Sequence, residues 1–505
     1  MARRHRHMVG FRILLVIAIP TMYFLCVSLT GIFAKGDRHV AVPNGGQTPD
    51  LIRSRKLLQI EEPLVLGAKK NCNQPSIQEF PPDGLTRTQR QSGFILIHVV
   101  IATYLFLLLA VVCDDFFVPS IQKICDKLQV TKDVAGATFM AAATSSPELF
   151  INVVGTFITE GDLGVGTIVG SAVFNILAVP ACCGLFANQV LDLDWWPITR
   201  DSLAYSMTVL LLIVTLRDGR IEWYEALILV ISYILYIMAM CFNKKISRCM
   251  RSMMKRKTTY QNLSEASPLI AKNFGDAEKG SIVETTEDES LEIVNMTKWP
   301  EPAAEKLWWV FTWPINLVLL FTIPDCRRKS LKSWYPITFL MCIVWIASMS
   351  YLVAWDITII GDTLEIPDSV MGLTFLAAGM SVPEAVSSVI VTNQGHGTMG
   401  ISNSIGSNVF DVLLCLGLPW FIKAVFLPKI PGTNFVQINS EGLIYSSISL
   451  FSTLILLYTA FVLNKFKLDR KVGITCLSMY GVFLIFASLT ELNVFFPVNL
   501  PTCVH

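Results

Sequence analysis

Charged residues are scarce in this chain, and their scarcity excludes an ordinary soluble domain. Asp, Glu, Lys and Arg make up 16% of the 505 residues, against about 25% in soluble globular proteins. Hydrophobic residues make up 53%, and the mean hydropathy is +0.54. The formal net charge of +1 says nothing about partners, because the charged residues are concentrated in loops. The chain is predicted to be a polytopic membrane protein whose partner is the lipid bilayer, with no nucleic acid.

The cysteines also lack the spacing that is typical of metal-binding sites. The 13 Cys form no pattern typical of a zinc or iron–sulfur site, and no resident cofactor is predicted. Cys72 and Cys503 both fall in segments predicted to lie outside the membrane, so a disulfide between them and two free thiols are equal alternatives. The paired Gly-Asp contexts of an intramembrane protease are missing from the apolar runs, since Asp162 and Asp362 are predicted in loops. The protein is therefore not expected to be an enzyme.

Two matched stretches organise the chain. Residues 136–148 read GATFMAAATSSPE and residues 372–384 read GLTFLAAGMSVPE, so 8 of 13 positions are identical. The same offset, without any gap, aligns GSAVFNIL at 170–177 with GSNVFDVL at 406–413. A pattern of small residues, hydroxyls and a carboxylate, repeated at hydrophobic depth, indicates two halves built around one site.

The apolar runs predict ten membrane-spanning helices, five in each half, since a helix needs about 20 residues to cross. The runs lie at 94–113, 134–159, 165–187, 203–216, 222–242, 337–357, 370–391, 401–422, 443–463 and 472–491. The run at 203–216 is short and is expected to be lengthened by Ser202 and its neighbours. The predicted fold class is an all-α polytopic membrane protein with two inverted five-helix repeats and an N-terminal signal segment.

The remaining segments complete the predicted domain organisation. Residues 1–34 have a basic start and an apolar core, which predicts a signal peptide or, less favoured, a signal anchor. The other predicted divisions are an extracellular segment 35–93, a first repeat 94–242, a cytoplasmic linker 243–336, a second repeat 337–491 and an extracellular tail 492–505. Lys and Arg clusters at 244–257 and 465–471 place those loops in the cytoplasm. The acidic stretch 356–368 is predicted to be an outer loop, and Lys423 is a mild contradiction on the same side.

One apolar segment, 307–323, is predicted to lie on or dip into the cytoplasmic face. It contains Pro314, ends before Pro324, and has basic residues on both flanks. With this segment not crossing, the two helices that carry Pro-Glu are the second and seventh spans and run in opposite directions. The repeat is therefore inverted, and its two glutamates can meet near the membrane midplane.

Glu148 and Glu384 lie inside apolar spans that lack Lys, Arg and His in their cores. An ionised acid at the bilayer centre costs about 2.5–3.5 kcal/mol on insertion scales, so each needs a partner. A bound cation is the simplest partner. The alternative, a protonated glutamate bonded to a neighbouring helix, is less favoured because the acid is duplicated in matched context.

The residues around these acids are predicted to supply hard oxygen ligands. Thr144, Ser145 and Ser381 precede the glutamates, while Pro147 and Pro383 each remove a helix hydrogen bond. Such ligands suit Ca²⁺ and Na⁺ rather than zinc or copper. The carbonyls expected to be freed are those near Ala141, Ala142, Ala377 and Ala378.

The second repeated motif breaks the symmetry by one charge. It contributes Ser171 and Asn175 in the first half, Ser407 and Asp411 in the second. Asn175 and Asp411 occupy equivalent positions. Three carboxylates balance one Ca²⁺ plus one K⁺, which motivates a monovalent site near Asp411.

At these residues the chain resembles the potassium-dependent sodium/calcium exchangers. The segments that carry the resemblance cover nearly all of the predicted membrane portion: VVCDDFFVPS, DVAGATFMAA, GVGTIVGSAVFNIL, EIPDSVMGLTFLAAG, SNSIGSNVFD and KLDRKVGI. Asp411 is the most discriminating position, because potassium-independent relatives usually carry Asn there.

The resemblance implies alternating access and electrogenic export of Ca²⁺ with K⁺ in exchange for Na⁺. It implies that Glu148 and Glu384 are shared Ca²⁺/Na⁺ carboxylates and that Asp411 is linked to K⁺. The supporting ligands would be Thr144, Ser145, Ser171, Asn175, Ser381 and Ser407. The family usually has Asp at position 384, and the extra methylene of Glu384 is expected to weaken Ca²⁺ binding.

The alternative function is a potassium-independent calcium/cation antiporter that uses Na⁺ or H⁺. A cation channel is a further class, which a Na⁺ gradient would not drive to accumulate Ca²⁺. The plasma membrane is the predicted location, with an intracellular organelle membrane as the alternative. A homodimer is also left open.

Overall fold

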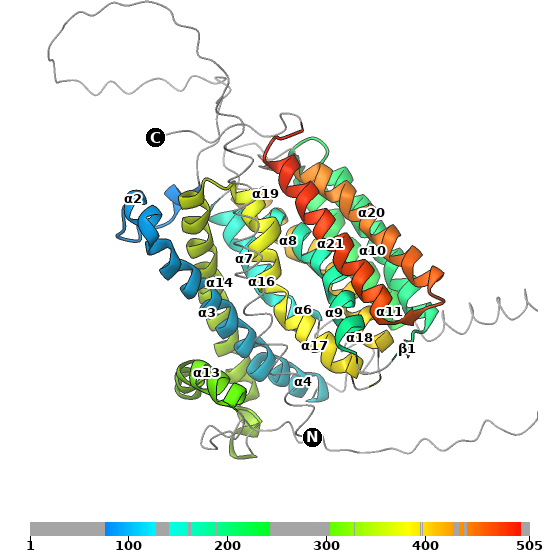
Figure 1. The fold of residues 1–505 in the computed structure, drawn as a ribbon, viewed down its shortest axis with the longest axis horizontal. Helices are drawn as coiled ribbons and strands as arrows, with labels where there is room; N and C mark the ends of the chain where they lie inside the picture. The colour runs from blue at the N-terminus through cyan, green and yellow to red at the C-terminus, as the bar shows by residue number, and fades with distance from the viewer. Residues whose placement is uncertain are drawn as a thin grey trace, which may run out of the picture.

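The computed structural model describes residues 76–127, 141–159, 163–187, 190–242, 303–327, 329–393, 395, 397–427, 434–438 and 442–495. The predicted signal segment, the predicted Cys72–Cys503 pair and most of the linker lie outside these residues. The described chain is almost entirely helical, with two pairs of very short strands (Figure 1).

The first half consists of five helical units, three of them interrupted. Before them come η1 (Ser76–Glu79), α2 (Arg87–Gln89) and η2 (Arg90–Phe94). The units are α3–η3–α4 (Ile95–Val111, Val112–Phe117, Val118–Lys127), α6–α7 (Ala141–Thr144, Ser146–Phe157), α8–η5–α9 (Leu163–Val173, Phe174–Ala178, Val179–Phe186), α10 (Trp195–Leu216) and α11 (Trp223–Cys241).

The second half repeats this order after α13 (Ala303–Thr322) and η6 (Lys329–Trp334). Its units are α14 (Tyr335–Leu364), α15–η7–α16–α17 (Asp368–Met371, Gly372–Leu376, Ala377–Met380, Val382–Asn393), α18–η8–α19 (Gly397–Phe410, Asp411–Leu416, Gly417–Phe426), α20 (Gly442–Leu463) and α21 (Arg470–Glu491). The strands are β1 (Leu191–Asp192), β2 (Arg220–Glu222), β3 (Phe435–Gln437) and β4 (Lys467–Leu468).

The strand pairs show that the two halves run in opposite directions. β1 pairs with β4, and β2 pairs with β3, both antiparallel. Helix α10 leads from β1 to β2, whereas α20 leads from β3 to β4. Because each sheet takes one strand from each half, α10 starts at the sheet where α20 ends. These equivalent helices are therefore antiparallel, as an inverted repeat requires.

Most predicted spans have a counterpart in the described residues. Eight helices are long and apolar enough to cross a membrane, and the bent unit α15–α17 makes up to nine. The tenth predicted span, 134–159, is described only from residue 141 onward. The short run at 203–216 belongs to the 22-residue helix α10, so the expected lengthening is confirmed and reaches back to Trp195.

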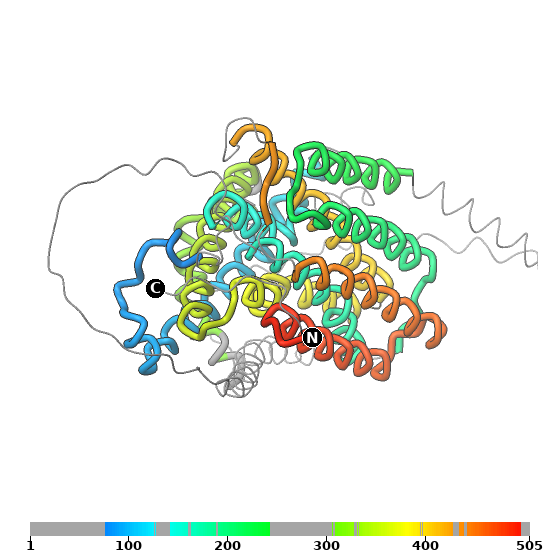
Figure 2. The backbone as a smooth tube through the Cα atoms, turned by 90° about the horizontal axis from the view of Figure 1, so that it is seen from above, coloured from blue at the N-terminus to red at the C-terminus, as the bar shows by residue number. Residues whose placement is uncertain are grey.

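The helices form a central group flanked by two outer groups. Figures 1 and 2 place α3 and α14 together at one edge, with α10, α11, α20 and α21 at the other. In the central span Leu163–Phe186, 89% of the apolar window is buried, against 17% in the outer helix Trp223–Cys241. The outer helices turn large apolar side chains outward, among them Leu235 and Val482, as lipid-facing helices do.

The stretch predicted to be an acidic outer loop, 356–368, is mostly helical. Asp356 and Asp362 belong to α14, which continues to Leu364. The helix ends where Glu365 adopts a left-handed conformation (φ 60°) and the N–H of Ile366 bonds the carbonyl of Gly361 at 2.9 Å. Pro367 follows and prevents continuation. The loop prediction was wrong because α14 continues for seven residues beyond the apolar run 337–357 that defined the predicted span.

The position of Lys423 explains why a cation is tolerated there. Its ammonium group donates to the carbonyl of Thr156 in the last turn of α7. A helix C-terminus carries a partial negative charge and unpaired carbonyls, both of which a lysine satisfies. Lys423 therefore joins the end of α7 to α19.

The segment predicted at the membrane surface is the helix α13. Ile315 and Leu319 are buried on one face, whereas Trp313 and Phe321 are exposed on another. Phe311 contacts Tyr104 of α3 edge-on, with ring centroids 5.5 Å apart. Figure 1 shows α13 near the α4 end of the bundle, with its axis turned away from that of α14.

Candidate functional site

The two glutamate-bearing helices are broken at equivalent serines. Ser145 separates α6 from α7, and Ser381 separates α16 from α17. Their dihedral angles are nearly the same, φ −94° and ψ 13° against φ −86° and ψ 4°. The second unit bends by 41° at this break. Because Pro147 and Pro383 lack an N–H, the helix cannot continue its hydrogen bonds through either position.

The structure corrects part of the prediction about which backbone carbonyls are free of helix hydrogen bonds. The Ala377 carbonyl accepts the N–H of Ser381 at 3.1 Å, so it stays within the helix and that prediction was wrong. A proline removes the bond to the carbonyl four residues earlier, which for Pro147 is Ala143. The Ser146 hydroxyl donates to that carbonyl at 3.0 Å.

Three carboxylates lie buried at this level of the bundle. Glu148 is in the first turn of α7, Glu384 is in the first turn of α17, and Asp411 begins η8. Each is 0% exposed, and they are close enough to repel one another. Within the described part of the chain, none of them pairs with Lys, Arg or His. Their charge has no protein counter-ion there.

Glu384 collects polar groups from both halves. Ser145 donates to Oε1 at 3.0 Å, and Ser407 lies 3.4 Å from Oε2. The side chains of Thr144 and Asn175 also face this carboxylate. Three of these four groups come from the first half and Glu384 from the second, so the site lies between the repeats.

The equivalent contact around Glu148 is incomplete. Ser381 is the counterpart of Ser145 and faces Glu148, but its hydroxyl makes no hydrogen bond, and neither Glu148 oxygen has a partner among the described residues. Leaving buried polar groups unsatisfied costs roughly 1–3 kcal/mol each, more when they are charged. A cation beside Glu148 would satisfy these atoms.

Asp411 and Asn175 lie in π-helical segments at equivalent positions, η8 and η5. Such segments are common at functional sites because they turn side chains out of the regular helical register. Asn175 donates to Asn408 Oδ1 at 3.1 Å, and Asn408 donates to the Ala172 carbonyl at 3.3 Å. Oδ1 of Asn175 and Oδ2 of Asp411 remain buried without partners in the described chain.

The structure gathers eight of the nine predicted residues around the buried acids, with Ser145 and Ser407 hydrogen-bonded to Glu384. Ser171 is the exception, because its hydroxyl donates to the Ile168 carbonyl of its own helix at 3.1 Å. All nine are buried.

Sequence reasoning missed four further polar residues. Asn152 donates to the carbonyl of Cys415, and the Cys415 thiol lies 4.0 Å from Asp411 Oδ1. Ser404 donates to the Asn175 carbonyl at 2.6 Å, and Asn408 is described above. Asn152 lies one helical turn after Glu148, so the i, i+4 rule would have pointed to it.

This arrangement presents oxygen ligands to a cation. Within the described residues, no three His, Cys, Asp or Glu side chains gather closely enough to hold a metal by themselves. Hydroxyl, amide and carboxylate oxygens together suit Na⁺, K⁺ and Ca²⁺.

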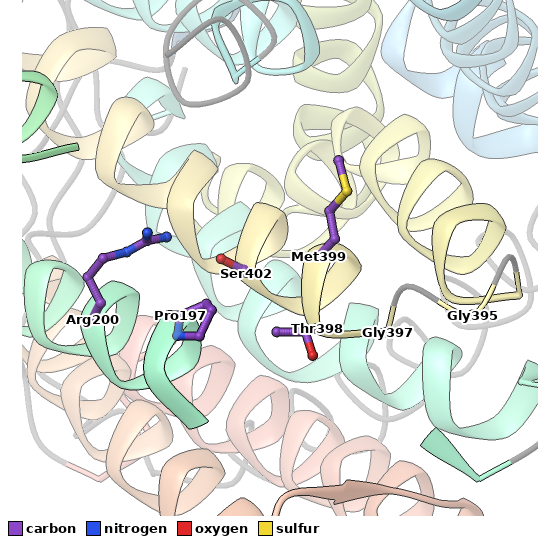
Figure 3. A pocket seen from close by; sticks show the side chains of 7 residues that line it. All are labelled: Pro197, Arg200, Gly395, Gly397, Thr398, Met399 and Ser402. Atoms are coloured by element: carbon purple, nitrogen blue, oxygen red, sulfur yellow. The ribbon is translucent and has the colours of Figure 1, made fainter. Parts of the chain in front are cut away.

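A separate pocket of about 370 Å³ lies between the starts of α10 and α18 (Figure 3). Its lining includes Arg200 and Ser402, both of which bond the buried Asp201. None of the nine predicted site residues lines it.

Comparison with known proteins places the chain among transporters. The family profile described as "Sodium/calcium exchanger protein" matches residues 98–242 and 334–489. The chain is 38% identical to sodium/potassium/calcium exchanger 4 of Mus musculus, covering 99% of this chain and 97% of the relative. It is 39% identical to sodium/potassium/calcium exchanger 5 of Homo sapiens, covering 86% and 91%.

A solved structure of the sodium-calcium exchanger NCX_Mj, soaked with Na⁺ and Sr²⁺, matches with a TM-score of 0.44 and 20% identity. The match covers 77% of this chain and 98% of the other. The profile and the near-full-length identities together show that this chain belongs to the sodium/calcium exchanger family.

Proposed function

We propose that the protein is an antiporter that exports Ca²⁺ together with K⁺ in exchange for Na⁺. The observation that carries this proposal is the buried group of Glu148, Glu384 and Asp411, which lacks a protein counter-ion among the described residues and lies between two inverted halves. The relatives at 38% and 39% identity are named sodium/potassium/calcium exchangers, which supports the same ions here.

The proposed ion ligands divide between the two halves. Glu148 and Glu384 would share Ca²⁺ or Na⁺, assisted by the oxygens of Thr144, Ser145, Ser381 and Ser407. Asp411 and the free Oδ1 of Asn175 would hold K⁺. Three carboxylates balance the charges of one Ca²⁺ and one K⁺. Ser171 would act as a supporting ligand through the lone pairs of its hydroxyl oxygen, which stay free while its hydrogen is donated to the Ile168 carbonyl.

Alternating access would follow from the inverted halves. The same ligands would face one side of the membrane and then the other as the halves exchange conformations. Each cycle would move net positive charge inward, so that 100 mV of membrane potential contributes about 2.3 kcal/mol per charge.

Ca²⁺ uptake into Na⁺-loaded vesicles, with and without external K⁺, tests this function. The expected result is uptake that needs both the Na⁺ gradient and K⁺. The Asp411→Asn variant should keep Na⁺-driven uptake but lose the K⁺ requirement, because the amide removes the charge that breaks the symmetry. Asp192→Asn, the same change on a surface strand, is the matched control and should behave as wild type. An unchanged K⁺ requirement in Asp411→Asn would refute the role of Asp411.

A calcium/proton antiporter is the second candidate, favoured by the same buried acids. It predicts Ca²⁺ uptake driven by a pH gradient and indifferent to K⁺. A channel would give no accumulation against the Ca²⁺ gradient.

The remaining assignments are also proposals. We place the protein in the plasma membrane, with α13 at the cytoplasmic surface and residues 35–93 and 492–505 outside. The exposed Trp313 and Phe321 of α13 suit a membrane interface, where aromatic side chains gather.

A further inference from the structure

A buried ionic cluster that shares no residue with the candidate ion site lies where residues 76–94 pack on α14. We call these residues the N-terminal cap. Trp355 of α14 donates to the Pro81 carbonyl at 3.0 Å, and Phe80 contacts Tyr351 with ring centroids 5.6 Å apart. Phe80 is 6% exposed. The cap is thus packed onto the helix rather than lying loosely over it.

At the centre of the cluster, His98 of α3 has a carboxylate on each ring nitrogen. Its Nδ1 lies 2.6 Å from Asp356 Oδ1 on α14, and its Nε2 lies 3.3 Å from Asp83 Oδ2 in the cap. The side chains of His98, Asp83 and Asp356 are 9%, 7% and 6% exposed. Nε2 is buried and has no hydrogen-bond partner among the described residues.

The other charged groups leave the cluster acidic. Arg90 bridges Asp83 at 3.2 Å and Asp362 at 3.1 Å. Arg87 and Glu365 form an exposed pair at the rim, 3.5 Å apart. Around His98 there are therefore three carboxylates and one buried arginine. One more positive charge would improve the balance.

A neutral imidazole cannot satisfy both contacts when the two carboxylates are ionised, because it has a single N–H. With that hydrogen given to Asp356, the lone pair of Nε2 faces the Asp83 carboxylate. A proton on Nε2 converts the contact into a charge-assisted interaction. Histidine is the side chain that gains this charge between about pH 5 and 8.

We propose that His98, Asp83 and Asp356 form a proton-binding site that fastens the N-terminal cap to α14. With the proton bound, the imidazolium joins the cap to α14 through a carboxylate on each side. When the proton leaves, the cap loses this charged link to α14 and keeps the Arg90 ion pairs, the Trp355–Pro81 hydrogen bond and the apolar contacts. The site would respond to acidity on the cap side of the membrane, which the charge pattern predicts to be extracellular. It does not rest on the proposed ion exchange.

Amide hydrogen exchange of peptides from 76–94 tests this site in the full-length purified protein. Rates at pH 6 and pH 8 are each divided by the intrinsic chemical rate at that pH. Wild type should be protected on the order of tenfold more at pH 6, the lower end for a hydrogen bond to a charged group. Equal protection at both pH values would overturn the proposal.

Substitutions distinguish a pH effect that arises at the His98 site from a general loosening of the cap. His98→Gln should abolish the pH difference, and Asp83→Asn should shrink it while keeping the side-chain shape. Arg87→Gln is the matched control, since it removes a cap charge at the exposed rim and should keep the full difference. A pH difference that persists in His98→Gln, or that disappears in Arg87→Gln, would contradict the assignment. If His98→Gln fails to fold, the wild-type comparison and Asp83→Asn still decide.

Discussion

Gly170 and Gly406 occupy equivalent positions in the two halves, yet the structure predicts opposite responses to alanine. A Cβ at Gly170 would lie 2.1 Å from the Leu373 carbonyl oxygen and 2.6 Å from the Ala377 Cβ. Ordinary contacts begin at 3.4 Å, so α8 and η7 would have to separate before the new methyl group could fit. At Gly406 the nearest atom is the Tyr236 hydroxyl at 3.6 Å, which requires no movement.

These contacts set the expected change in the free energy of unfolding for each alanine variant. Overpacking a core costs about 1–3 kcal/mol and sometimes more, and the upper end applies because the obstacle at Gly170 is backbone. Alanine in a helix is favoured over glycine by about 1 kcal/mol. Gly170→Ala should therefore destabilise the protein by about 2 kcal/mol or more, whereas Gly406→Ala should be neutral or stabilising by up to about 1 kcal/mol.

Thermal unfolding of the two purified variants, followed by tryptophan fluorescence at one scan rate, measures this difference. Gly170→Ala should unfold several degrees below wild type, and Gly406→Ala should not. The fraction that remains monodisperse after heating gives an independent readout. Equal losses in both variants would refute the reasoning, because glycine would then matter for a reason common to both halves rather than for close contact between them.

Other changes test the site and its supports. Glu384→Asp should lower the apparent Km for Ca²⁺, since the shorter acid leaves more room for the ion; no change or a rise would count against this. Ser145→Ala should weaken apparent Ca²⁺ affinity about tenfold, the loss of a hydrogen bond to a charged group, whereas Ser206→Ala on an exposed helix face should have no effect. Lys423→Met should lower stability by about 1 kcal/mol, seen as a reduced unfolding temperature, because the Thr156 carbonyl loses its cation.

The internal repeat made much of the architecture predictable. Its constant offset aligned Ser145 with Ser381 and Asn175 with Asp411, and the structure places each pair in matching helix breaks or π-helical segments. It could not reveal Asn408, because the equivalent residue is Ala172 and a symmetric comparison passes over an unmatched position. Ser171 shows the opposite limit, since a matched hydroxyl can still be engaged by its own helix.

Other features lay beyond sequence periodicity for physical reasons. The strands are two or three residues long, too short for an alternating pattern to be read. The acidic end of α14 looked like a loop, although Asp356 and Asp362 are paired by His98 and Arg90. Those partners belong to α3 and to the N-terminal cap, in the other half of the sequence, so their neutralising effect becomes visible only in three dimensions.

The two strand pairs have a consequence for how the molecule holds together. β1–β4 and β2–β3 each join the first half to the second, and they lie at opposite ends of α10. The two halves are thus joined covalently through residues 243–302 and also by a hydrogen-bonded strand pair at each end of α10. Two fragments synthesised separately, one ending and one starting inside that connection, contain all four strands and should reassemble into a single transporter.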